Sequence, residues 1–245
     1  MIVYEGKDLK VTFYPFESEI VLFLFSDLDW DLESRRNTDL GSKFGMNVIF
    51  FGALEQHWWQ TEEAEGAASA VKEISNQYPE RVAYGSSMGG YGALWWSGRL
   101  NANRCIAVSP QTNISDANLP LLQPWKDAIA KRPIYRDQIA EDIPSGLLPR
   151  IIYDPRSKID ASHANWLANK KTVSLDIFPF STHKLLTTLY EAGSLREAVQ
   201  GLIRGSMSTA ELRLLTRISR PKSHTYSKML QHSLILRNKS RCRSM

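Results

Sequence analysis

The sequence has few cysteines and no long apolar run. Only Cys105 and Cys242 occur among 245 residues, far apart along the chain, which argues against a disulfide framework or a zinc site. The longest apolar run near the start, residues 20–25, is too short to cross a bilayer. The N-terminus also lacks the basic-then-apolar pattern of a signal peptide. From these absences we expect a protein of the reducing cytoplasm.

Charge is distributed unevenly along the chain. Residues 205–245 contain nine Lys or Arg and one acidic residue, Glu211, for a net charge of +8. The whole chain carries +4, so residues 1–204 are mildly acidic, at −4. The positive total therefore does not indicate a nucleic-acid-binding surface over the whole chain. A second copy of the chain or an acidic partner is a candidate for the basic tail, and nothing points firmly to nucleic acid or a membrane.

Apolar runs of strand length alternate with helical stretches, which predicts an α/β fold with a mostly parallel sheet. The expected strands are Lys10–Tyr14, Ile20–Phe25, Asn47–Phe51, Arg81–Tyr84, Arg104–Val108, Arg150–Tyr153 and Val173–Phe178. The expected helices are Glu62–Gln77, Gly90–Leu100, Ala161–Lys171 and Lys184–Leu202.

Two segments interrupt this alternation. Residues 111–148 show no clean strand and are rich in proline, so we expect short helices that form a lid over the site. Residues 205–245 show apolar residues at helical spacing on either side of Pro221, which predicts a helical C-terminal appendage. The main domain is then residues 1–204.

The segment Gly85-Ser86-Ser87-Met88-Gly89 is a G-x-S-x-G motif between an expected strand and an expected helix. In a nucleophile elbow this turn is so sharp that the residues two before and two after the serine must be very small. Ser87 would be the nucleophile, and the Met88 amide would help to hold an oxyanion. A glycine-rich turn without chemistry is the alternative interpretation.

A serine nucleophile needs a histidine and a carboxylate, in the chain order serine, acid, histidine. His183 follows the last expected strand and precedes a helix, which suits a general base. Asp154 ends the strand Arg150–Tyr153 and is the favoured acid. Asp160 is the alternative, although it also suits a helix N-cap.

Further residues are candidates for the rim of the site. The second oxyanion donor should follow strand 20–25, at Ser26 or Asp27. Trp58 and Trp59 would form an aromatic wall for substrate, or else pack in the core. Gln111 follows strand 104–108 and is expected to line the pocket.

The segment Tyr84-Gly-Ser-Ser-Met-Gly-Gly-Tyr-Gly-Ala-Leu resembles the elbows of bacterial esterases in the α/β-hydrolase superfamily, and the likeness covers about residues 10–204. The segments that begin at His57 (His-Trp-Trp-Gln), Ser109 (Ser-Pro-Gln) and Tyr153 (Tyr-Asp-Pro) are similar to bacterial hydrolase-like proteins, some linked to surface-polysaccharide genes. The resemblance implies an eight-stranded sheet and ester-type substrates. The His-Gly pair that many lipases carry in the oxyanion loop is missing here.

The sequence therefore predicts an α/β-hydrolase fold and a serine hydrolase that cleaves an ester or related acyl bond through an acyl-enzyme on Ser87. Its substrate would be a small acyl ester, carbohydrate-linked esters included, and the chemistry requires no metal or organic cofactor. Two alternatives stay open. One is an acyltransferase that uses the same triad, and the other is a non-catalytic binding protein that keeps the hydrolase fold.

Overall fold

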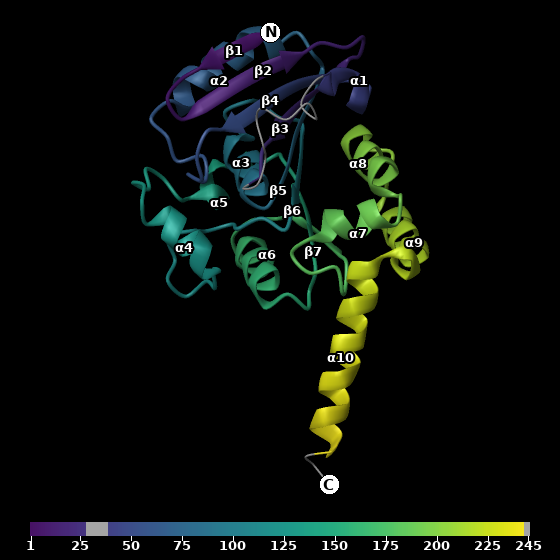
Figure 1. The fold of residues 1–245 in the computed structure, drawn as a ribbon. Helices are drawn as coiled ribbons and strands as arrows, with labels where there is room; N and C mark the ends of the chain where they lie inside the picture. The colour runs from purple at the N-terminus through teal and green to yellow at the C-terminus, as the bar shows by residue number, and fades with distance from the viewer. Residues whose placement is uncertain (28–38, 243–245) are drawn as a thin grey trace.

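The computed structural model describes residues 1–27 and 39–242 and places an eight-stranded sheet at their centre (Figure 1). The strand order across the sheet is β1-β2-β4-β3-β5-β6-β7-β8. β2 pairs antiparallel with β1 and β4, and the other neighbouring strands are parallel. The strands are β1 (Ile2–Glu5), β2 (Leu9–Tyr14), β3 (Ile20–Phe25), β4 (Asn47–Ala53), β5 (Glu80–Ser86), β6 (Arg104–Val108), β7 (Arg150–Tyr153) and β8 (Ser174–Ile177).

Helices cover both faces of the sheet. The helices are α1 (Leu40–Phe44), α2 (Ala64–Ser75), α3 (Met88–Trp96), α4 (Gln123–Ile129), α5 (Ile139–Asp142), α6 (Lys158–Lys170), α7 (Leu185–Glu191), α8 (Leu195–Arg204), α9 (Thr209–Ser219) and α10 (His224–Cys242). A short 3-10 helix, Arg220–Lys222, joins the last two. Within the described residues, no helix is long and apolar enough to cross a bilayer.

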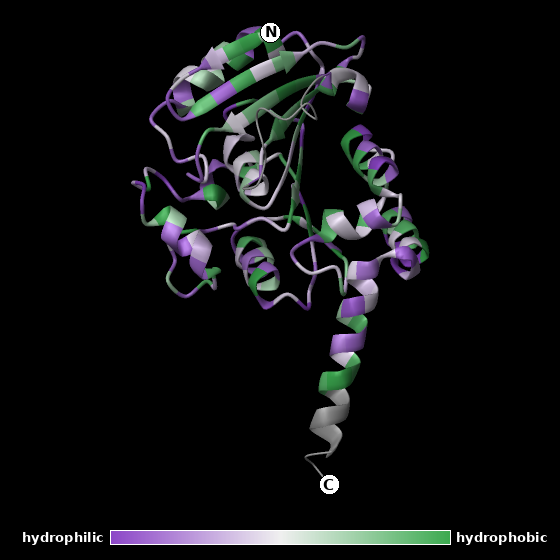
Figure 2. Cartoon of the chain, viewed as in Figure 1, coloured by the Kyte–Doolittle hydropathy of each residue, from purple (hydrophilic) through white to green (hydrophobic). Residues whose placement is uncertain are grey.

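The central strands are mainly apolar because side chains on both of their faces are buried. In β3, Phe23 and Phe25 pack in one core cluster, with residues of α2, α3 and α6. Leu22 and Leu24 pack in the other, with residues of α1, α7 and α8. Figure 2 shows the resulting hydrophobic colour of the central strands. Parallel strands buried in this way bring their carboxyl ends to one edge, where the connecting loops meet.

Most predicted elements are observed. Two short elements were not predicted, namely β1, a four-residue strand at the sheet edge, and the five-residue helix α1. The single helix predicted over residues 184–202 is wrong, because the chain breaks into α7 and α8 around Gly193, whose φ is 72°. In the insertion between β6 and β7 the structure places the short helices α4 and α5, and in the C-terminal tail it places α9 and α10.

Candidate active site

Ser87 lies at the turn between β5 and α3 in a backbone conformation that side chains rarely adopt, with φ 54° and ψ −121°. The two flanking glycines explain why the turn is possible. A Cβ atom at Gly85 would lie 2.1 Å from the Gly89 carbonyl oxygen, and one at Gly89 would lie 2.5 Å from the Phe25 carbonyl oxygen. The Ser87 amide donates to the Val108 carbonyl at 2.8 Å, which fixes the turn to β6. This is the strained geometry expected of a nucleophile elbow.

His183 lies between Ser87 and a carboxylate. Its Nε2 is 2.9 Å from the Ser87 Oγ, and its Nδ1 is 2.7 Å from Asp160 Oδ1. With the ring proton on Nδ1, the imidazole donates to Asp160 and accepts the hydroxyl proton of Ser87. Asp160 is buried, with 2% of its surface exposed. The three side chains therefore form a continuous hydrogen-bonded serine–histidine–aspartate triad.

The carboxylate beside His183 is Asp160, the alternative acid, and not the favoured Asp154. Asp154 is also buried, but its two oxygens accept the backbone amides of Arg156 at 2.9 Å and Thr182 at 2.7 Å. The N-cap role that suited Asp160 belongs to Ser157, whose Oγ accepts the Asp160 amide. Asp160 therefore lies inside the first turn of α6, where the helix dipole favours a negative charge.

Asp154 instead holds the loop that carries His183. Phe180 and Thr182 both have left-handed backbones, with φ values of 69° and 60°, which is costly for residues other than glycine. The Thr182 amide is held by Asp154, and the Phe180 ring lies under the Arg156 guanidinium at 4.3 Å. These contacts fix the strained loop, so Asp154 is a positioning residue in this geometry.

The insertion between β6 and β7 packs directly on the triad. Trp125 of α4 lies against the His183 ring, with 4.9 Å between the ring centroids, and only 7% of the Trp125 surface is exposed. His163, fully buried in α6, accepts the Thr112 amide at Nδ1 and makes a 3.2 Å hydrogen bond from Nε2 to the Pro120 carbonyl. Helix α6 thus carries both Asp160 and, one turn later, His163, which holds the start of the insertion through Thr112 and Pro120.

Burial lowers the pKa of His163 below its ordinary value of 6.5, outweighing the hydrogen bond to Pro120 and the nearby charges of Asp160 and Asp137. The folded protein keeps this ring neutral, whereas the unfolded chain takes up a proton as the pH falls through about 6.5. We therefore expect the free energy of unfolding to decrease between about pH 7.5 and 5.5.

Urea unfolding at several pH values measures this decrease. The His163→Gln variant should lose less stability over the same interval, because it has no proton to take up at this position. An identical pH dependence in His163→Gln and the wild type would contradict the prediction.

Three residues were expected at the oxyanion hole, and one of them, Met88, directly follows Ser87. Met88 begins α3 immediately after the nucleophile, and the first-turn amides of a helix have no partner within the helix. Of the two residues considered for the second donor, Ser26 uses its amide to bind the Phe51 carbonyl. Asp27 is half-buried and follows it directly. Its role as a donor stays a prediction.

The two tryptophans of the His57–Gln60 segment have different environments. Trp59 is fully buried and donates to the Met88 carbonyl at 2.8 Å, packed so closely on α3 that a Cβ atom at Gly92 would lie 2.4 Å from its Nε1. It belongs to the core. Trp58 donates to Gln111 at 3.3 Å, and Gln111 in turn lies 3.4 Å from Ser87 Oγ. Gln111 therefore borders the nucleophile, Trp58 contacts Gln111, and both are buried.

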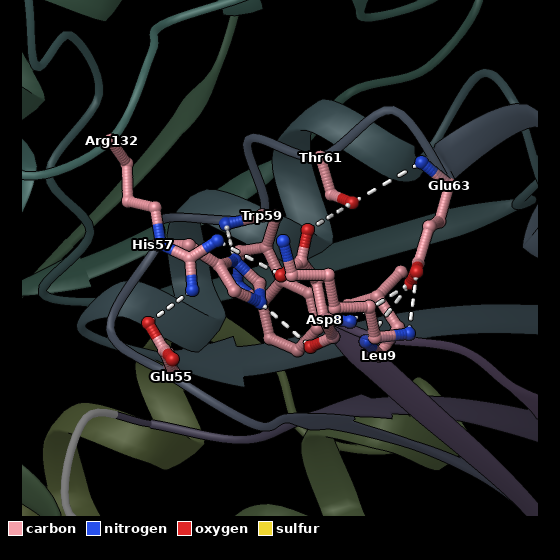
Figure 3. Close-up of polar contacts among 9 residues, drawn as sticks. Asp8, Leu9, Glu55, His57, Trp59, Thr61, Glu63 and Arg132 are labelled. Atoms are coloured by element: carbon pink, nitrogen blue, oxygen red, sulfur yellow. Dashed lines mark hydrogen bonds and ion pairs between the residues drawn. The ribbon is translucent and has the colours of Figure 1, made fainter.

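A polar network fastens this segment to the insertion and to the sheet edge (Figure 3). His57 Nδ1 accepts the Trp59 amide, and Nε2 donates to the Asp8 carbonyl at 3.0 Å. Arg132, which follows α4, pairs with Asp8 at 2.9 Å and with Glu55. Burial raises the pKa of Asp8, but hydrogen bonds from Arg132 and Thr61 outweigh it and lower the pKa overall. Sequence reasoning missed this network, which joins residues up to 124 positions apart.

Comparison with known proteins shows structural likeness at low sequence identity. The chain is similar to the capsule O-acetyltransferase of Neisseria meningitidis serogroup A (TM-score 0.58, 15% identity, 82% of this chain and 93% of that one). It is also similar to a dienelactone hydrolase from Anabaena variabilis (TM-score 0.53, 14% identity, 82% and 92%). A third likeness is to an alpha-beta serine hydrolase homologue from Coxiella burnetii (TM-score 0.50, 12% identity, 85% and 96%). No protein-family model matches the sequence, and the search of curated proteins finds no match.

Proposed function

The chain has the α/β-hydrolase fold, as the sequence predicts, and from this premise we propose that it is an enzyme that handles acyl groups through an acyl-enzyme on Ser87. The observation that carries the proposal is the continuous triad in which His183 bridges Ser87 at 2.9 Å and Asp160 at 2.7 Å. A turn that merely connects a strand to a helix does not require a strained serine, two flanking glycines and a buried acid aligned on one imidazole.

In this mechanism His183 Nε2 takes the hydroxyl proton while Ser87 Oγ attacks the carbonyl carbon of an ester. The oxyanion of the tetrahedral intermediate is held by the Met88 amide. Asp160 orients the ring and stabilises its cation. The proton then passes from His183 to the leaving alcohol as the ester bond breaks. A water molecule then attacks the acyl-enzyme with the same help from His183, which returns the proton to Ser87 Oγ. This step releases the carboxylic acid product and completes hydrolysis of the ester.

The test is labelling with a fluorophosphonate, which modifies only activated serines, together with turnover of p-nitrophenyl acetate. We expect the adduct to map to Ser87 and both signals to be lost in Ser87→Ala and in His183→Ala. Ser86→Ala is the matched control, because it removes the neighbouring hydroxyl, and it should keep labelling. Equal turnover in the wild type and Ser87→Ala, or no adduct on folded protein, would instead favour a non-catalytic binding protein.

Acyl transfer is the second candidate, because Trp125 packs against one side of the His183 ring, with 4.9 Å between the centroids. An apolar wall on that side reduces the access of water there, so a bound hydroxyl acceptor can compete for the acyl group. The likeness to a capsule O-acetyltransferase supports the same candidate. Product analysis with p-nitrophenyl acetate and added sugars discriminates the two reactions. Acetylated sugar indicates transfer, whereas free acetate alone indicates hydrolysis.

A further inference from the structure

The C-terminal helix α10 leaves the body of the protein and extends away from it (Figure 1). Its base is fixed to the body, because Tyr226 packs edge-on against Phe180 at 5.8 Å and Ser233 accepts a hydrogen bond from Arg156 at 2.8 Å. Beyond Ser233 the helix continues to Cys242, a further ~14 Å at 1.5 Å per residue. The direction of α10 is therefore fixed relative to the body.

Large aliphatic side chains on this helix are exposed to solvent. Leu234 and Ile235 are 50% and 52% exposed, and Leu236 is 54% exposed although it also borders a cavity against the body. Three consecutive residues span about 200° around the helix axis, so the body cannot cover all of them. An isolated helical end is marginal in water. A helical end with exposed aliphatic side chains is typical of a segment that packs against another apolar surface.

The charge of the same segment identifies the kind of surface it fits. Residues 224–245 contain five Lys or Arg and no acidic residue. This charge disfavours pairing between the α10 helices of two copies, because like charges would be brought together. Single-stranded nucleic acid binds largely by stacking its bases on aromatic side chains. The sequence of α10 has one Phe, Tyr or Trp, and this residue, Tyr226, already packs against Phe180. Exposed leucine and isoleucine in a segment of net positive charge match an anionic lipid surface, where aliphatic groups enter the acyl boundary and cations contact the headgroups.

We propose that α10 docks this protein peripherally on membranes that contain anionic lipids, with Leu234 and Ile235 entering the interface. The proposal does not depend on the chemistry of Ser87. It differs from a spanning segment, since the helix lies on the lipid surface and the basic residues remain at the headgroups.

The test is co-sedimentation of the full-length protein with vesicles of phosphatidylcholine alone and of phosphatidylcholine mixed in equal parts with phosphatidylglycerol. We expect binding to the anionic vesicles only, weakening as salt is raised. The Leu234→Ser/Ile235→Ser variant should bind about tenfold more weakly or worse. Because both side chains are exposed, this variant should keep the wild-type thermal unfolding and fluorophosphonate labelling.

Helix α9 offers a matched control. Leu214 and Ile218 are 58% exposed each, so Leu214→Ser/Ile218→Ser makes the same chemical change elsewhere and should keep vesicle binding. The proposal is overturned if the wild type does not sediment with anionic vesicles, or if both double variants bind equally well. It is also overturned if the wild type forms an oligomer and does not bind vesicles, while the Leu234→Ser/Ile235→Ser variant is a monomer. Binding to duplex DNA that is stronger than binding to vesicles would assign the helix to nucleic acid and equally overturn it.

Discussion

Asp160→Asn is expected to lower kcat by about 10⁴-fold, the loss typical when the acid of a serine triad becomes an amide. The Asp160 carboxylate accepts the proton on His183 Nδ1 at 2.7 Å. An asparagine can present its NH₂ group there, which favours the tautomer with the proton on Nε2. That tautomer cannot accept the Ser87 hydroxyl proton. Turnover of p-nitrophenyl acetate measures the loss.

Asp154→Asn is the matched comparison, because both aspartates are buried to the same extent and lie six positions apart. Asp154 accepts two backbone amides, so the amide variant leaves one donor unsatisfied and loosens the His183 loop. We expect about 1–3 kcal/mol of lost stability and a fall in kcat of only about 10- to 100-fold. If Asp154→Asn lost as much kcat as Asp160→Asn while equally folded, the assignment of the acid to Asp160 would be refuted.

Gly85→Ala should be among the most destabilising substitutions in the chain, by about 3 kcal/mol or more. The added methyl would lie 2.1 Å from the Gly89 carbonyl oxygen and 2.2 Å from its carbon. Both are backbone atoms of the elbow, so the clash cannot be relieved by rotating a side chain. Either the turn opens, which displaces Ser87, or the β5–α3 packing is lost. Urea unfolding measures the change in the free energy of unfolding, and fluorophosphonate labelling reports the position of Ser87.

Gly66→Ala is the control for this substitution. Gly66 lies within α2, and a Cβ atom there would meet only the Tyr4 ring at an ordinary 3.7 Å. Replacing a helical glycine by alanine should stabilise the protein by about 0.5–1 kcal/mol. An unfolding free energy of Gly85→Ala within about 1 kcal/mol of the wild type would mean that the elbow tolerates a side chain at this position.

The elbow could be predicted because its constraints are local. A strand, a serine between two glycines and a helix occupy one continuous stretch, and the two glycines are required by contacts within that stretch and with β3. His183 could be predicted for a related reason. In a parallel sheet the loop after the last strand reaches the same edge as the elbow, so only the position of one histidine relative to one strand was needed.

The position of the acid could not be predicted in this way. Asp154 and Asp160 both follow β7, and which of them reaches His183 depends on where α6 begins. A local signal was present in Ser157-Lys-Ile-Asp160, a pattern typical of a capping box. It places Asp160 inside the first turn rather than at the cap, as the Ser157 hydrogen bond confirms. The pairing of Arg132 with Asp8 had no such signal, because the insertion must fold back on the sheet edge before these residues meet.

The shared anchoring of Asp160 and the insertion on α6 has a consequence for protein engineering. Thr112 and Pro120, near the start of the insertion, are held by His163, whereas Trp125 lies beyond this anchored stretch. A chimera that exchanges residues 121–148 for a segment of another enzyme would therefore keep the His163 contacts to Thr112 and Pro120 and the position of Asp160. It would lose the pairing of Arg132 with Asp8. The grafted segment must therefore supply a cation of its own at the sheet edge if Asp8 is to stay paired.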